Sequence, residues 1–156
     1  MKKLTVLFIA VVSVFTFCLC SCAGGSNKNP APKDVVAAVK ESTQFEELLP
    51  LEEAPLSRRY YGIDLEVIEE YQAEACPSGA YADEIAVFKV KDKENVEDML
   101  DVVRERKQEL YDTFVDYVPD EINKIENAVI GSNGKYVYFI VCSDRAAAKA
   151  AVESCF

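Results

Sequence analysis

DEIAVFKVKDKENVEDMLDVVRERKQELYDTFVDY, residues 83–117, decides the fold, because it joins a predicted strand to a predicted long helix. Residues 83–91 are rich in branched and aromatic side chains, which favours a strand whose core face carries Ala86, Phe88 and Val90. Asp92 is a suitable N-cap for the helix that follows. Pro119 ends that helix, because proline has no N–H to donate within it.

The helix after Asp92 has one buried stripe, because its apolar residues recur every three or four positions. The stripe comprises Val96, Met99, Leu100, Val103, Leu110, Phe114 and Tyr117. The charged residues between them, Arg104, Arg106, Lys107 and Glu109, are expected to face water. The helix should have about 24 residues and a length of roughly 36 Å.

Two further segments with a periodic pattern precede this strand and helix in the sequence. Residues 67–76 alternate, with Tyr71, Ala73 and Ala75 on one face and polar or acidic side chains between them. A period of two over this length predicts a strand with one face in water. Residues 34–42 carry three valines on one side and predict a short amphipathic helix.

The chain after Pro119 predicts a hairpin and a last helix. Ser132-Asn133-Gly134 separates two apolar runs, and Asn-Gly in that setting is a strong hairpin signal. The second run, residues 136–142, is nearly apolar on both faces and should lie centrally in the sheet. Residues 145–154 then predict a helix capped by Ser143 or Asp144.

These segments indicate an α+β domain in the order helix, strand, strand, helix, strand, strand, helix. We expect a four-stranded antiparallel or mixed sheet with helices packed mainly on one face. The strand order and the oligomeric state stay open. Residues 1–21 are assigned to a signal peptide, residues 22–33 to a flexible tether and residues 34–156 to this single domain.

The first residues have the order of a secretory signal peptide: a cationic start, an apolar run and small residues at its end. Leu19-Cys20-Ser21-Cys22 resembles the lipobox of bacterial lipoproteins, which implies that the thiol of Cys22 is diacylated and becomes the first mature residue. The alternative is an uncleaved transmembrane anchor, but the apolar run is shorter than the roughly 20 residues that a bilayer-spanning helix needs. The sequence therefore predicts a membrane-anchored, extracytoplasmic protein.

The composition excludes several classes of function. The net charge is −10, and a strongly acidic surface repels phosphate backbones, so nucleic acid is not an expected partner. The chain has no histidine, which removes imidazole-based catalysis and histidine-ligated zinc. No enzyme activity, cofactor or metal is expected.

The sequence leaves open whether the cysteines form a disulfide and whether adjacent acidic residues form a site. Beyond Cys22 the expected state is three buried free thiols, Cys76, Cys142 and Cys155, with a bridge from Cys76 to either of the others as the alternative. Adjacent acid pairs could serve a glycosidase or bind calcium, but solvated surface positions are the expectation. The pairs are Glu52-Glu53, Glu69-Glu70, Asp83-Glu84 and Asp120-Glu121.

The cluster Arg58, Arg59, Tyr60 and Tyr61 is the candidate contact patch. Guanidinium groups beside phenol rings can recognise an anionic or sugar-like ligand through forked hydrogen bonds and stacking. The structural alternative is that Tyr60 and Ile63 pack against the domain. Gly62 would then permit a turn, and Asp64 would cap a short helical turn.

Four blocks of the chain resemble a family of small Gram-positive lipoproteins classed only as a domain of unknown function. The blocks are Tyr60-Tyr61-Gly62-Ile63-Asp64, Glu69-Glu70-Tyr71, residues 83–91, and residues 126–130 with Gly134-Lys135-Tyr136-Val137. The resemblance covers residues 34 to about 144. It implies an uncharacterised, membrane-anchored protein and supplies no catalytic residues.

We therefore expect a non-enzymatic binding or envelope-assembly module, held to the membrane by a diacylglyceryl anchor on Cys22. An accessory lipoprotein that binds a small ligand for transport or sensing is the alternative. A hydrolase that uses carboxylates alone is a third hypothesis. A concave pocket lined by tyrosines and arginines would favour the ligand binder, and a convex patch would favour an envelope protein as partner.

Overall fold

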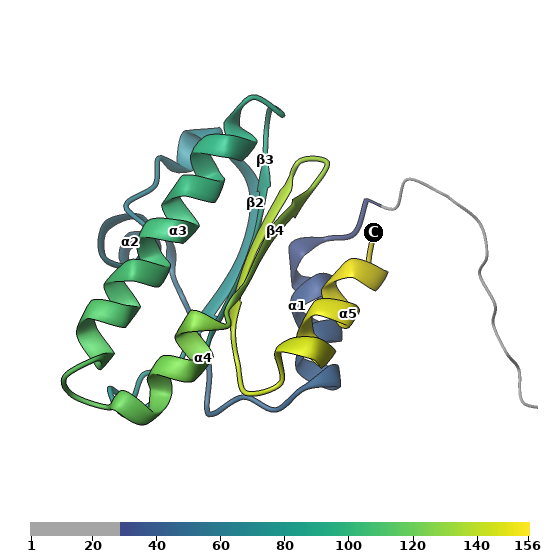
Figure 1. Cartoon of the computed structure of the whole chain (residues 1–156). Coiled ribbons are helices and arrows are strands. Elements are labelled where there is room, and N and C mark those ends of the chain that lie inside the picture. Colours follow the sequence, from purple (N-terminus) through teal and green to yellow (C-terminus); the bar gives the residue numbers. More distant parts are fainter. Residues whose placement is uncertain (1–28) are drawn as a thin grey trace, which may run out of the picture.

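The computed structural model describes residues 29–156, so the predicted signal peptide, Cys22 and most of the tether lie outside the described residues. These residues form an α+β domain around a five-stranded antiparallel sheet (Figure 1). The longer elements are α1 (Pro32–Ser42), β2 (Ile68–Ala75), β3 (Glu84–Val90), α3 (Asn95–Phe114), β4 (Val129–Asn133), β5 (Tyr136–Val141) and α5 (Arg145–Ser154). The short ones are β1 (Leu49–Pro50), α2 (Glu53–Pro55), the π-helical turn η1 (Leu56–Tyr60), the 3₁₀ turns η2 (Leu65–Val67) and η3 (Pro119–Glu121), and α4 (Ile122–Glu126).

The sheet has the order β1-β2-β3-β5-β4, so the prediction of four strands was wrong by one. The additional strand, β1, has two residues and pairs with Glu74 and Ala75 of β2. Its second residue is Pro50, which cannot donate to the ladder and is tolerated because β1 lies at the edge. A two-residue strand ending in proline carries no alternation, and the sequence pattern therefore did not indicate it.

β3 and β5 pair with each other in the interior of the sheet, and every residue of both strands is buried. The central position predicted for β5 is confirmed. A strand buried on both faces needs cover on both sides. The expectation of helices mainly on one face was wrong: α3 and α4 cover one face, and α1 and α5 cover the other (Figure 1).

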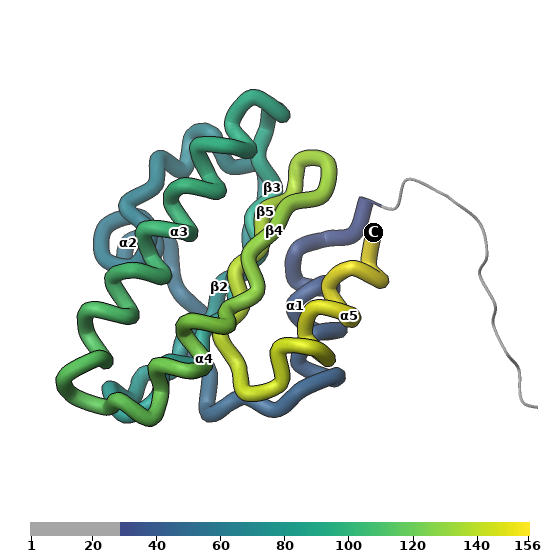
Figure 2. The backbone as a smooth tube through the Cα atoms, in the orientation of Figure 1, coloured from purple at the N-terminus to yellow at the C-terminus, as the bar shows by residue number. Residues whose placement is uncertain are grey.

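Each face of β3 has its own core. Ala86, Phe88 and Val90 pack toward α3, as predicted, together with Val103 and Phe114. The alternate side chains of β3 pack on the opposite face against the valines of α1 and against Ala148 and Val152 of α5. Helices from the two ends of the described chain thus lie side by side (Figure 2).

The long helix is shorter than predicted. It begins at Asn95, and Asp92 serves not as its N-cap but as a backbone acceptor, because its carbonyl accepts from the amide of Asn95 at 3.1 Å. The helix ends at Phe114, and the predicted buried position Tyr117 is 76% exposed. Within residues 29–156, no helix has the length and apolar character needed to cross a membrane.

The predicted hairpin is present, with its turn one residue later than expected. Asn133 pairs with Tyr136, so Gly134 and Lys135 form a two-residue turn. Gly134 has a φ of +60°, which glycine adopts without strain. The last helix is confirmed, and Asp144 caps it by accepting from the amide of Ala147 at 2.9 Å.

Of the three thiols predicted to be buried, only that of Cys142 is, whereas Cys76 and Cys155 are half-buried. Cys76 is a half-buried free thiol and Cys142 a buried one, so neither alternative bridge from Cys76 forms. The thiol of Cys155 donates a hydrogen bond to the carbonyl of Ala151 at 3.3 Å.

Candidate functional site

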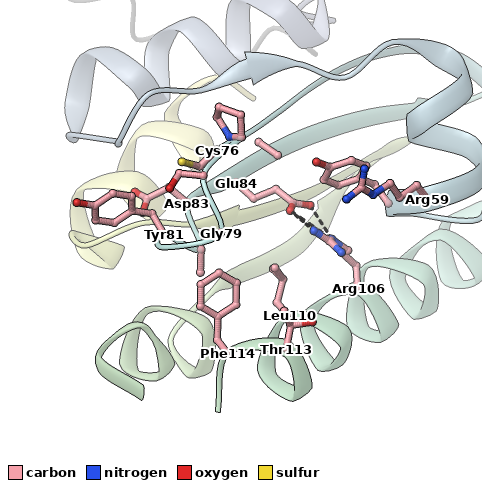
Figure 3. A pocket seen from close by; sticks show the side chains of 15 residues that line it. Arg59, Cys76, Gly79, Tyr81, Asp83, Glu84, Arg106, Leu110, Thr113 and Phe114 are labelled. Atoms are coloured by element: carbon pink, nitrogen blue, oxygen red, sulfur yellow. Dashed lines mark hydrogen bonds and ion pairs between the residues drawn. The ribbon is translucent and has the colours of Figure 1, made fainter. Parts of the chain in front are cut away.

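A pocket of about 350 Å³ lies between α3, η1 and the loop that joins β2 to β3 (Figure 3). Arg59 and Tyr60 line it from η1, and the loop contributes Cys76 to Gly79, Tyr81 and Ala82. Arg106, Leu110, Thr113 and Phe114 line it from α3. Figure 3 shows the carboxylate of Glu84 joined by dashed lines to the guanidinium of Arg106. The pocket therefore combines charged, aromatic and apolar side chains.

Glu84 and Arg106 form a buried ion pair at the pocket. Nε of Arg106 donates to both carboxylate oxygens of Glu84, at 3.1 and 3.2 Å, and Nη2 donates to Oε2 at 2.7 Å. The side chains are 2% and 13% exposed, respectively. Burial by itself would lower the pKa of Arg106, but the hydrogen bond and the charge of Glu84 outweigh it and raise that pKa. The pair is therefore charged and fixed in orientation.

Tyr61 completes this arrangement from the core side. Its hydroxyl donates to Oε1 of Glu84 at 2.5 Å, and its ring meets Phe88 edge-on at 5.1 Å. Burial, and then the negative charge of Glu84, raise the pKa of Tyr61 well above its usual value of about 10. Glu84 is thus held by a guanidinium on one side and a phenol on the other.

Neither partner of this ion pair was predicted, because charge was taken to mean exposure. Glu84 belongs to an acid pair expected on the surface, and it is 1% exposed. Arg106 was expected to face water, and it packs inward. A signal was present: position 106 lies three residues after Val103 and four before Leu110, so it continues the buried stripe of α3.

Two guanidinium groups, those of Arg59 and Arg106, lie near the ring of Tyr60. The central carbon of Arg106 is 4.8 Å from the centre of the Tyr60 ring, and that of Arg59 is 5.9 Å from it. Both distances are within the range of a cation–π contact. Arg106 has Glu84 as counter-charge. Arg59 is exposed, and no carboxylate of residues 29–156 forms an ion pair with it.

The predicted contact patch is divided between three environments. Arg59 and half-buried Tyr60 line the pocket, Arg58 is exposed and lies outside it, and Tyr61 is 6% exposed in the core. The expected turn at Gly62 and the expected cap at Asp64 are both present in the structure. Gly62 has a φ of +59°, and the carboxylate of Asp64 accepts from the amide of Glu66 at 2.8 Å.

A family model described as "Domain of unknown function (DUF4358)" matches residues 36–142, well over half of the chain. The chain belongs to this family. Comparison with curated proteins and with solved structures gave no match. All residues that line the pocket lie within the matched range, whereas α5 lies beyond it. The pocket is therefore a feature of the DUF4358 domain itself.

A second buried charge cluster fixes one wall of the pocket in the DUF4358 domain. Nζ of Lys124 lies 2.7 Å from Oδ2 of Asp83 and 2.9 Å from Oε2 of Glu121, which also accepts from the amide of Ala82 at 2.9 Å. Burial would lower the pKa of Lys124, but its hydrogen bonds to Asp83 and Glu121 outweigh burial and raise it. Asp83 and Glu121 were expected on the surface, and both are buried.

The carboxylates of Glu84, Asp83 and Glu121 already have partners within the DUF4358 domain. Residues 29–156 contain no group of three or more cysteine, aspartate or glutamate residues arranged to hold a metal ion. Both oxygens of Glu84 already accept hydrogen bonds. A second pocket of about 380 Å³ is lined mainly by hydroxyl groups and acids, with Phe45 as its large apolar residue. The first pocket is thus the better ligand site, because it adds apolar walls and two guanidinium groups.

Proposed function

We propose that the chain is a lipid-anchored, extracytoplasmic protein whose DUF4358 domain binds a small ligand in the pocket beside Glu84 and Arg106. The observation that carries the proposal is a concave space with arginine and tyrosine in its walls. Its volume of about 350 Å³ falls in the range of small-molecule sites, roughly 300 to 1,000 Å³. A flat or convex patch would instead have favoured an envelope protein as the partner.

A binding role is favoured over catalysis by the chemistry of the pocket. A general base must have an oxygen or nitrogen within reach of the substrate proton. The two oxygens of Glu84 are occupied by Arg106 and Tyr61, and Oδ2 of Asp83 is occupied by Lys124. The chain has no histidine to take their place. These groups suit recognition and orientation of a ligand.

The anchor is proposed from the leader and the lipobox-like residues before Cys22. Two acyl chains give a stable attachment where one is marginal. From Cys22 to Asn29 a fully extended chain spans at most about 25 Å, at about 3.5 Å per residue. The domain would therefore stay close to the outer surface of the membrane. The net charge of −10 of the whole chain disfavours nucleic acid and anionic headgroups as ligands.

The anchor is tested with Cys22→Ser, using Cys20→Ser as the matched control. We expect the wild type and the control to fractionate with membranes, and their intact mass to show loss of residues 1–21 and gain of a diacylglyceryl group. The Cys22→Ser variant should lack this modification and leave the membrane fraction. An unmodified wild-type chain that still begins at Met1 would refute the anchor.

The pocket is tested with a thermal-shift screen of sugars, nucleosides, amino acids and carboxylates on the purified protein. Thr113 is exposed on α3 at the pocket, so Thr113→Trp should fill the space and remove the shift caused by any true ligand. Glu105→Trp, an exposed position on the same helix outside the pocket, is the control and should keep the shift. Ligands that bind both variants equally would refute a role for the pocket.

A further inference from the structure

We infer that the ligand of this pocket is a small carboxylate with an apolar substituent, whose carboxylate is held jointly by Arg59 and Arg106. The inference rests on the proposed function, that the pocket binds a small molecule, and it names the chemical class. Three observations carry it: the free donors of Arg106, the unbalanced charge of Arg59 and the apolar wall beside them.

Arg106 retains hydrogen-bond donors after its contacts within the protein are counted. A guanidinium has five N–H groups. Glu84 takes those of Nε and one of Nη2, and Glu109 takes one of Nη1 at a long 3.4 Å. One N–H on Nη1 and one on Nη2 remain. The two terminal nitrogens can therefore still donate to the oxygens of a bound carboxylate.

Arg59 supplies a positive charge that the described residues do not neutralise. Its one interaction in residues 29–156 is with the ring of Tyr60, which it shares with Arg106. Two cations near one ring repel each other, and an anion that contacts both would reduce that repulsion. Because Glu84 holds Arg106 rigidly, this cationic end of the pocket is formed before the ligand arrives.

The other walls decide what the anion is attached to. The apolar lining of the pocket comes from Leu110 and Phe114 of α3, from Ala75 at the end of β2, and from Ala82 in the loop between β2 and β3. An apolar substituent would bury surface there. A second negative charge would instead meet Glu84 and Asp83 in a chain of net charge −10, so a monoanionic carboxylate is favoured over phosphate. A neutral sugar would leave Arg59 without a counter-charge.

Saturation-transfer NMR of the purified full chain with benzoate tests the inference. We expect benzoate to bind to the wild type. Arg59→Gln should weaken this binding about tenfold, because it removes one charge-assisted hydrogen bond. Arg58→Gln removes the same charge from the neighbouring residue, which lies outside the pocket, and should keep the affinity within about twofold. Methyl benzoate and inorganic phosphate should not displace benzoate.

Equal affinity of Arg59→Gln and wild type, or displacement of benzoate by methyl benzoate or by phosphate, would overturn the inference. Failure of the inference is distinguishable from failure of the proposed function. If a neutral ligand from the screen binds in a manner blocked by Thr113→Trp while benzoate does not bind, the pocket function stands and the carboxylate class is wrong. If Thr113→Trp blocks no ligand, the pocket function itself is wrong.

Discussion

Oε2 of Glu84 lies 2.7 Å from Nη2 of Arg106, and this ion pair joins the central strand β3 to the helix α3. The pair lies where the apolar core of that face gives way to the pocket. It ties the two elements together, and it also sets the position of a guanidinium that lines the pocket. If the pocket binds the proposed ligand, stability and binding are coupled at this point.

Replacing Glu84 with glutamine should destabilise the protein by about 3 to 5 kcal/mol, because it leaves the mostly buried charge of Arg106 without its partner. Glutamine keeps an acceptor for Tyr61, so the change isolates the charge. Urea denaturation measures the effect, and the double variant with Arg106→Met should recover part of the loss. Arg104→Met removes two exposed ion pairs on the same helix, those with Glu97 and Asp101, and should cost less than about 1 kcal/mol. If Glu84→Gln and Arg104→Met lower the free energy of unfolding equally, the buried pair does not contribute more to stability than the exposed ones.

Tyr61 should make the protein sensitive to alkaline conditions. Its pKa is raised in the folded state by burial and by Glu84, so its contribution is complete below the unfolded pKa of about 10 and is lost as pH rises above that value. Tyr61→Phe should cost about 1 to 2 kcal/mol at neutral pH. Measured from about pH 8 to pH 11, the wild type should lose stability more steeply than the variant. Parallel curves would show that Tyr61 does not titrate with unfolding.

Gly131 permits the close approach of a neighbouring tyrosine. A Cβ at this position would lie 2.5 Å from the hydroxyl oxygen of its cross-strand partner, Tyr138, whose ring also stacks on Phe156 at 6.4 Å. Gly131→Ala should therefore cost about 1 to 3 kcal/mol. Gly79→Ala is the control, because nothing lies within 4 Å of its Cβ, and it should be neutral or slightly stabilising. Thermal unfolding of both variants decides the comparison, and an equal melting temperature would show that Tyr138 moves aside at no cost.

Most of the regular elements were predictable, because each shows its period in the sequence. The helix at residues 34–42, the strands β2 and β3, the hairpin and the last helix all agree with the structure to within about two residues. Residues 136–142 also indicated helices on both faces of the sheet. This strand is apolar on both of its faces, and each face needs a layer packed against it. The alternation of residues 67–76 points the other way, because it predicts a strand with one face in water.

The candidate site was only half predictable. Arg59 and Tyr60 stood out as a basic and aromatic cluster, and both line the pocket. Glu84 and Arg106 did not, because they are far apart in the sequence and only the packing of α3 on β3 brings them together. A charged residue on the apolar stripe of a helix is the sequence signal for such a pair, and it points to a buried partner of opposite sign.

Lys124 is the counter-charge of two buried carboxylates, those of Asp83 and Glu121, and the last prediction concerns its removal. Lys124→Met should destabilise the protein by about 3 to 5 kcal/mol at neutral pH, because two like charges are then buried without compensation. Urea denaturation of this variant and of the wild type measures the loss of stability.

The same change should loosen the wall of the pocket, since Glu121 also holds the amide of Ala82. Hydrogen exchange at this amide should speed up in Lys124→Met. It should not change in Lys149→Met, which removes an exposed pair on α5. If exchange at Ala82 is unaffected by Lys124→Met, the charge cluster stabilises the fold without organising the pocket. A ligand should then bind this variant as tightly as it binds the wild type.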